Sequence, residues 1–167
     1  MKRLYLLRHA KAAADDGGGD HERPLAVRGR QDAPAMGRAM AERGFVPSLL
    51  LCSSARRTAE TLDLVLPFLI PPPRVQLEPG LYHAPAEVIL DRVVRAAATA
   101  QAVLVIGHNP GLEDLAAHLA GDTKIGRQLA GGMPTCAFAA FESGEVDWRA
   151  AVTGSWSADV FLRPADL

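Results

Sequence analysis

Short apolar runs alternate with helical patterns along this chain, and that alternation leaves few folds open to it. Ala102–Ile106 is a continuous apolar run that ends at Gly107, as in a strand buried on both faces of a sheet. An apolar stripe of helical period follows it, and Gly121 comes directly after this stripe, whose members are Leu112, Leu115, Ala116 and Leu119. A strand followed closely by a helix is the unit of a parallel sheet covered by helices.

The same alternation predicts the other elements. Further strands are expected at Leu4–Leu7, at Leu49–Cys52 and around Val75 and Leu77. Helices are expected at Gln31–Arg43, with Pro34 in its first turn, from about Ala55 to Leu69 with a bend or end at Pro67, and from Pro85 onward. A closing hairpin is expected from Phe138–Phe141 and Trp148–Thr153, followed by a short irregular tail. The pattern therefore predicts an α/β fold, a three-layer sandwich with a mostly parallel central sheet flanked by helices.

Length and charge limit the function classes. The chain has 167 residues, which suits a single domain over residues 1–167. Its formal net charge is -1, so no basic field favours nucleic acid, and no apolar run approaches the length of a membrane span. The apolar N-terminal stretch is too short for a signal peptide. Cys52 and Cys136 are far apart in the sequence and are expected to be reduced core thiols. We expect a cytoplasmic protein with no membrane and no nucleic-acid partner.

Cationic and imidazole side chains follow three of the expected strands. Arg8 and His9 follow the first, the segment Ser53–Arg57 follows the second, and His108 and Asn109 follow the central apolar run. In parallel sheets, sites form beyond the carboxyl ends of the strands. Arginine is an always-charged fork that suits phosphate oxygens, and the helix that begins near Leu112 points free N–H groups at the same edge. This arrangement predicts a local anion site in a protein that is not basic overall.

The chemistry open to such a site centres on His9. Nearby positive charge disfavours protonation of an imidazole, so His9 is expected to be neutral near pH 7, and a neutral imidazole can attack phosphorus. The arginines would then neutralise the charge of the transferring phosphoryl group. No carboxylate is grouped with the histidines at ligand spacing, so no metal or other cofactor is expected.

Each of these residues also has a purely structural interpretation. Arg8 and His9 alone would form an exposed strand end, and Asn109 would cap a helix before Pro110. Arg56 and Arg57 alone would be a solvated helix start, where positive charge is slightly unfavourable. One shared site explains the residues at all three strand ends more simply than three unrelated structural roles do.

Other polar residues near these segments are open to more than one interpretation. Arg23 either closes over a substrate or forms a salt bridge, and Arg28 has the same alternatives. The segment Asp15–Asp20 lacks the ligand spacing of a calcium loop and is expected to be a mobile loop. His83 either lines the pocket or caps the following helix, and Trp148 and Trp156 are expected to pack in the core.

Three motifs in this order resemble those of the histidine phosphatase superfamily, which has the phosphoglycerate mutase-like fold. They are RHA at Arg8–Ala10, S-x-x-x-R-x-x-x-T at Ser53–Thr61 and GHNPG at Gly107–Gly111. Smaller features resemble its short SixA-type phosphohistidine phosphatase branch, namely ERPLAVRGR at Glu22–Arg30, GLYHA at Gly80–Ala84 and FLRP at Phe161–Pro164. The resemblance runs nearly end to end.

The resemblance implies a role for each matching residue. His9 would accept the phosphoryl group covalently, Arg8 and Arg57 would bind its oxygens, and His108 would donate a hydrogen bond to it. Arg57 rather than Arg56 matches the family arginine, counting back from Thr61. Water would hydrolyse the phosphoenzyme without a metal.

A proton donor is the one role without a clear match. Phosphomonoester members of the superfamily use a carboxylic acid to protonate the leaving oxygen, and Glu78 is the nearest candidate, although its spacing to Tyr82 differs from the mutase pattern. A SixA-type enzyme can do without such an acid, because imidazole leaves more readily than an alkoxide.

Four functions compete at this point. The first is a phosphohistidine phosphatase acting on a protein of the histidine phosphotransfer or phosphocarrier type. The second is a phosphatase for a small phosphomonoester. The third is a non-catalytic phosphate- or protein-binding module, against which the presence of His9 argues, because a binder needs the cations but not the nucleophile. The fourth, a metal hydrolase using His9 and His108, would lose activity in chelator.

Overall fold

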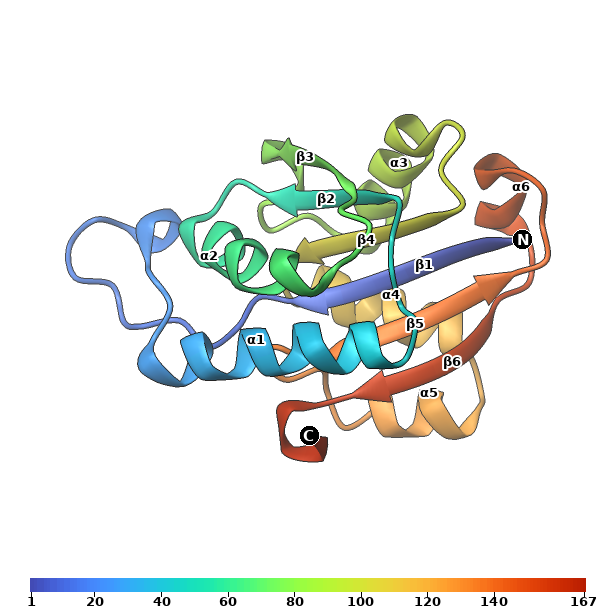
Figure 1. The fold of residues 1–167 in the computed structure, drawn as a ribbon. Coiled ribbons are helices and arrows are strands. Elements are labelled where there is room, and N and C mark those ends of the chain that lie inside the picture. The colour runs from blue at the N-terminus through green and yellow to red at the C-terminus, as the bar shows by residue number, and fades with distance from the viewer.

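A six-stranded sheet forms the centre of the computed structural model, which describes residues 1–167 (Figure 1). Its strand order is β3-β2-β4-β1-β5-β6, with bounds β1 Lys2–Arg8, β2 Leu49–Ser53, β3 Arg74–Glu78, β4 Ala102–Gly107, β5 Phe138–Ser143 and β6 Ser157–Leu162. The first four strands are mutually parallel, and β5 runs antiparallel to both of its neighbours. The sheet is therefore mixed but mostly parallel, as predicted.

Helices cover both faces of this sheet. Their bounds are α1 Val27–Glu42, α2 Arg56–Val65, α3 Ala86–Ala97, α4 Gly111–Ala120, α5 Lys124–Leu129 and α6 Trp148–Thr153. In Figure 1, α1 and α2 lie in front of the sheet, and α4 lies behind it. This is the predicted three-layer α/β sandwich.

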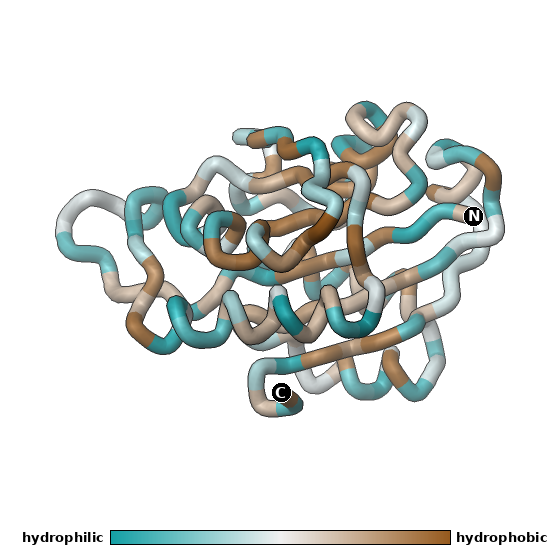
Figure 2. The backbone as a smooth tube through the Cα atoms, in the orientation of Figure 1, coloured by the Kyte–Doolittle hydropathy of each residue, from teal (hydrophilic) through white to brown (hydrophobic).

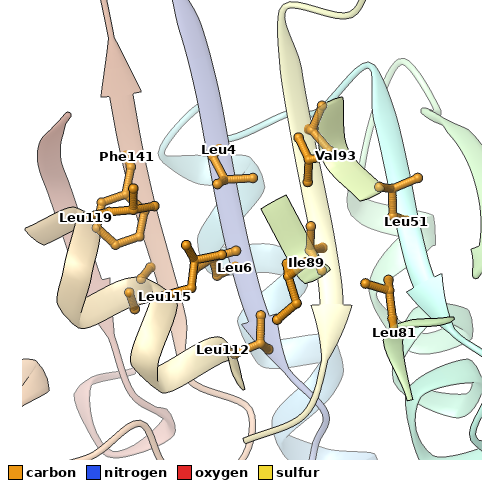
Figure 3. Close-up of a cluster of buried hydrophobic side chains, with 14 of the residues drawn as sticks. Leu4, Leu6, Leu51, Leu81, Ile89, Val93, Leu112, Leu115, Leu119 and Phe141 are labelled. Carbon is orange, nitrogen blue, oxygen red and sulfur yellow. The ribbon is translucent and has the colours of Figure 1, made fainter. Parts of the chain in front are cut away.

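Alternate residues of β1 bury themselves in two separate cores. Leu4 and Leu6 join the cluster that packs against α3 and α4, and Figure 3 shows Leu6 next to Leu115 of α4. Tyr5 and Leu7 point the other way, into the cluster against α1 and α2. A central strand with helices on both faces needs apolar residues at every position. That requirement explains the continuous apolar runs, which Figure 2 shows along the strands of the interior.

The C-terminal region differs from the predicted hairpin. Trp148–Thr153 is a helix, α6. The strand that follows β5 and pairs with it is β6, in the segment expected to be an irregular tail. Asp147 starts α6 by accepting a hydrogen bond from the Ala150 N–H through its side chain. Trp148 and Ala151 are both buried, and their spacing of three residues puts them on one helix face. A short helix with so few apolar positions has a pattern that a strand can also show.

Two further differences concern helices. α1 begins at Val27, before the expected Gln31, so Pro34 lies inside the helix and not in its first turn. The helix continues through Pro34, which has no N–H to donate to the carbonyl of Arg30. α5 was not predicted. α2 ends at Val65, where a 3-10 turn at Leu66–Phe68 contains Pro67, in agreement with the predicted break.

Two smaller expectations concern the thiols and the membrane. Cys52 and Cys136 are both free and buried, as predicted. None of the helices combines the length and the apolar character that a bilayer crossing requires.

Candidate active site

The carboxyl ends of β1, β2 and β4 meet at one edge of the sheet, where their arrowheads point the same way in Figure 1. The loops that follow these strands enclose a cavity of about 310 Å³, here called the strand-edge pocket. Its lining includes all the predicted cations and imidazoles, Arg8, His9, Arg57 and His108 with Asn109, and also Lys11, Arg23 and His83. The fold thus brings together residues that lie a hundred positions apart in the sequence.

His9 lies at the floor of the strand-edge pocket and is only 7 % exposed. Its Nδ1 lies 2.8 Å from the carbonyl oxygen of Ala10. Because a carbonyl can only accept, Nδ1 carries the proton and Nε2 keeps a free lone pair. Burial lowers the pKa of His9 to about 4, and the charges of Arg57 and Arg8 act in the same direction. His9 is therefore neutral at pH 7, with Nε2 available as a nucleophile.

His108 lies beside His9, with ring centroids 5.3 Å apart, and is 3 % exposed. Its Nε2 lies 2.7 Å from Ser53 Oγ. The Ser53 oxygen itself accepts from the N–H of Ala55, so its hydroxyl is free to donate to His108. That tautomer leaves the proton on Nδ1, which has no partner in the protein. Burial and the nearby His9 and Arg57 lower the pKa of His108 to about 3.

The S-x-x-x-R-x-x-x-T motif connects three parts of this site. Ser53 orients His108, as described, and Arg57 projects into the pocket from the first turn of α2. Thr61, one turn later, accepts a hydrogen bond of 3.0 Å from the N–H of Ala10 and donates one of 2.7 Å to the Arg57 carbonyl. α2 is thereby attached to the loop that carries His9.

The two adjacent arginines at the start of α2 differ completely in their surroundings. Arg57 is 3 % exposed, and its Nη1 and Nη2 donate to the backbone oxygen and the carboxylate of Asp20 at 2.8 and 3.1 Å. Arg56 is exposed and pairs with Glu60 at 2.8 Å. The choice of Arg57 from the motif spacing agrees with this placement.

Several buried polar atoms of the pocket lack partners. Arg8 donates through Nη1 to the Met133 carbonyl at 3.0 Å, but its Nε has no acceptor. The Nε of Arg57 and the Nδ1 of His108 are also unpartnered. A buried donor without an acceptor is costly, so three of them on residues of one pocket need an explanation. An anion in the pocket would offer acceptor oxygens to donors of this kind.

Asp20 is a member of the site that the sequence analysis missed. It was assigned to a mobile loop, but it opens a 3-10 turn at Asp20–Glu22, and its carboxylate lines the strand-edge pocket. The carboxylate accepts from Arg23 at 3.0 Å, from Arg57 and from the hydroxyl of Tyr82. These donors hold the pKa of Asp20 far below its usual range, with the Tyr82 hydroxyl the largest influence. The spacing of three residues between Asp20 and Arg23 was the one available signal.

Glu78 lies outside the pocket. It is the last residue of β3, and its oxygens contact Gln76 Nε2 at 2.7 Å and Arg92 Nη1 at 3.5 Å. The structure therefore does not bring this candidate proton donor together with His9, and Asp20 is the one carboxylate that lines the pocket.

The remaining candidates take mixed positions. Arg23 forms the expected salt bridge, with Asp20, and it also lines the pocket, so its closing over a substrate stays a prediction. Asn109 does not cap α4. Its amide donates to Glu113 at 3.0 Å and to the Met133 carbonyl at 2.8 Å, and Pro110 precedes the helix instead. His83 lines the mouth of the pocket. No three His, Cys, Asp or Glu side chains are grouped as a metal site requires.

The sheet order, the helices on both faces and the pocket at the strand ends define an α/β protein of the phosphoglycerate mutase-like class. The chain belongs to the histidine phosphatase superfamily (branch 1), whose sequence profile matches residues 4–82.

Several known proteins are similar to this chain over nearly its whole length. An uncharacterized protein of Mycobacterium tuberculosis, Rv1276c, is 32 % identical over 160 residues, which cover 92 % of this chain and 91 % of that protein. A solved structure from Agrobacterium tumefaciens, provisionally named the phosphohistidine phosphatase SixA, matches with a TM-score of 0.81 and 30 % identity over 98 % of this chain and 99 % of the other. One from Nakamurella multipartitia with the same provisional name matches with a TM-score of 0.83 and 26 % identity over 98 % and 96 %.

Proposed function

We propose that this protein is a metal-independent phosphatase that removes phosphoryl groups from phosphohistidine through a covalent intermediate on His9. One observation carries the proposal. A neutral His9 with a free Nε2 shares its pocket with Arg8, Arg57 and His108, which together offer three unpartnered buried donors. That is a nucleophile and an anion cradle in one cavity. The activity would reside in one domain, residues 1–167, of a cytoplasmic protein.

The first step transfers the phosphoryl group to His9. The Nε2 lone pair forms a bond to phosphorus, and the electrons of the breaking bond pass to the leaving group. Arg8 and Arg57 balance the charge on the phosphoryl oxygens, and His108 donates to one of them through Nδ1. The His9 Nδ1 proton stays in its hydrogen bond to the Ala10 carbonyl.

The second step hydrolyses the phosphoenzyme. Water attacks phosphorus, the bond to Nε2 breaks, and the water proton passes to a phosphate oxygen. Because Nδ1 has kept its proton, His9 leaves as a neutral imidazole and not as an imidazolate. The Ala10 carbonyl thus prepares His9 both to attack and to depart.

Two observations favour phosphohistidine in a protein over a small ester. The solved structures of 30 % and 26 % identity carry the provisional name of a phosphohistidine phosphatase. Glu78, the candidate acid for an alkoxide leaving group, lies outside the pocket. We therefore propose a phosphorylated protein of the histidine phosphotransfer or phosphocarrier type as the partner, with binding of phosphate-like anions as a simpler property of the same pocket.

The test is dephosphorylation of a phosphohistidine protein and of an aryl phosphate, both in chelator. We expect wild type to prefer the protein substrate and His9→Ala to be inactive, because it lacks the nucleophile. Arg57→Lys should lose about a hundredfold in kcat/KM, the size typical of losing a group that stabilises transition-state charge. Arg56→Lys, its matched neighbour, should stay within about twofold, since Arg56 is exposed and touches only Glu60.

Each outcome decides between the candidates. Preference for the aryl phosphate would favour a small-molecule phosphatase. Activity that disappears in chelator would favour a metal hydrolase, and full activity in His9→Ala would contradict the nucleophile assignment. Binding of inorganic phosphate without turnover of either substrate would favour a non-catalytic module.

A further inference from the structure

The mouth of the strand-edge pocket carries a negative charge that the two-step mechanism does not use. Asp20 is the one carboxylate among the lining residues, in a pocket whose other charged members are arginines and Lys11. A carboxylate placed there works against binding of a phosphoryl group, whose charge is also negative. Its contacts with Arg23 and Arg57 explain how it is held there, and they leave open what it does toward the substrate.

The contacts of Asp20 show that it is ionised. Arg23 donates to Oδ1, while Arg57 and the Tyr82 hydroxyl donate to Oδ2. All three partners donate hydrogen bonds to the carboxylate, and this pattern favours its deprotonated form. Oδ2 also lies 3.4 Å from His83 Nε2, whereas Oδ1 has Arg23 as its one partner. Each carboxylate oxygen can accept about two hydrogen bonds, so one position on Oδ1 remains open. Asp20 is consequently suited to accept a hydrogen bond from a ligand and unsuited to protonate a leaving oxygen.

Asp20 is also more exposed than His9 in the pocket that they share. In an in-line transfer the leaving group is opposite the attacking atom. His9 is 7 % exposed at the floor of the pocket. The side chains of Asp20 and His83, 3.4 Å apart, are 44 % and 57 % exposed at the mouth. A leaving group that departs from buried His9 toward solvent passes the mouth of the pocket, where Asp20 lies.

We infer that Asp20 determines specificity by accepting a hydrogen bond from the leaving imidazole of phosphohistidine, so that this pocket selects phosphoramidates over phosphate esters of alcohols. The inference rests on the proposed function and names the group that chooses its substrate class. An alcohol ester presents no N–H to Asp20 and requires a proton donor that an ionised carboxylate cannot be.

The chemistry balances with no further reactant. The phosphohistidine ring of the substrate is protonated on the nitrogen remote from phosphorus, and that N–H donates to Asp20. His9 Nε2 bonds to phosphorus, the P–N bond breaks, and its electrons stay on the departing ring nitrogen. The remote proton never leaves the ring, so the product is a neutral imidazole. Asp20 would do for the substrate ring what the Ala10 carbonyl does for His9 in the second step.

The test compares kcat/KM for a phosphohistidine peptide and for an aryl phosphate in wild type, Asp20→Asn and Asp16→Asn. Asp16 is a matched control, because it is an exposed carboxylate of the same loop that contacts only the Gly18 N–H. We expect Asp20→Asn to lower the ratio of phosphohistidine to aryl phosphate activity by about tenfold or more, as befits one charge interaction near a protein surface. Asp16→Asn should leave the ratio unchanged.

A second variant and an inhibition measurement keep the result interpretable if Asp20→Asn disturbs Arg57. Tyr82→Phe removes one donor to Asp20 but keeps the carboxylate, so it should retain the wild-type preference. Inhibition of Asp20→Asn by inorganic phosphate should be as strong as in wild type or stronger. Equal losses for both substrates, with weaker phosphate inhibition, would show that Asp20 only positions Arg57 and would overturn the inference. If wild type itself cannot hydrolyse the phosphohistidine peptide, the proposed function fails first.

Discussion

Most polar side chains that this protein buries belong to the strand-edge pocket or its supports. This set of buried residues comprises His9, Ser53, Arg57, Thr61 and His108. Burial of a charged or polar group is unfavourable unless partners compensate it, and several atoms here have none. An anion that binds in the pocket would offer acceptors to the unpartnered donors of Arg8, Arg57 and His108. At the scale of the residue, stability and function are therefore in competition.

His9 makes the free energy of unfolding depend on pH. In the unfolded chain His9 has its ordinary pKa of 6.5, and in the folded protein its pKa is about 4. Between these values the unfolded state binds more protons, so the stabilisation is complete above pH 6.5 and is lost as the pH falls toward 4. We expect the free energy of unfolding to fall between pH 7.5 and 5, with about 2 kcal/mol of the decrease due to His9.

Urea unfolding of wild type and His9→Asn at both pH values measures this contribution. The variant should lose less stability on acidification, because asparagine does not titrate. An identical pH dependence in the two proteins would mean that His9 keeps its ordinary pKa in the fold.

At the scale of the element, glycines allow the segments of the pocket to approach one another. A Cβ on Gly111, the first residue of α4, would lie 1.9 Å from the carbonyl oxygen of Ala84. A Cβ on Gly29 in α1 would lie 2.2 Å from the carbonyl oxygen of Lys11. Both glycines stand in motifs that the sequence analysis noted, GHNPG and ERPLAVRGR. Their role is to let helices pack directly on the backbone of loops.

Gly111→Ala should therefore separate α4 from the segment around Ala84. We expect a loss of about 2 kcal/mol of stability, typical of overpacking, and a lower kcat/KM because His108 lies three residues before Gly111. Gly144→Ala is the matched control, since nothing lies within 4 Å of its added Cβ, and it should change stability by less than about 0.5 kcal/mol. Thermal unfolding measures both. Equal stability of the two variants would contradict the close packing of α4.

At the scale of the whole molecule, the sheet separates two cores of similar size. Cys52 and Cys136 both lie in the core against α1 and α2, and both are completely buried. Burial raises the pKa of each thiol to about 12. Reaction of either thiol thus requires the core to open, since the thiolate is the reactive form.

A thiol reagent should accordingly report global unfolding. We expect neither cysteine to react in the native protein on the time scale of minutes, and both to react in denaturant. The reaction rate in intermediate denaturant should follow the unfolded fraction seen by circular dichroism. Rapid reaction of one thiol in the native protein would show local opening of this core.

The sequence predicted the parallel strands and the residues that follow them, because each depends on a local pattern. A central strand must be apolar throughout, and the residue after it must lie at the carboxyl edge of the sheet, whatever the rest of the chain does. Leu4–Leu7 with Arg8 and His9 is such a case. Trp148–Thr153 is the opposite case, because a six-residue segment with two buried positions fits a strand or a helix until the Asp147 cap is seen.

The sequence alone thus determined the fold class. It also determined which side chains meet at one edge of the sheet, namely Arg8, His9, Arg57 and His108. The position of Asp20 and the exclusion of Glu78 were decided in three dimensions. Asp20 enters the pocket because Arg23, Arg57 and Tyr82, from three separate segments, converge on its carboxylate. Glu78 stays outside because it is the last residue of β3, where its carboxylate contacts Gln76 and Arg92. Hydrogen bonds between distant segments have no periodicity, so no local pattern announces them.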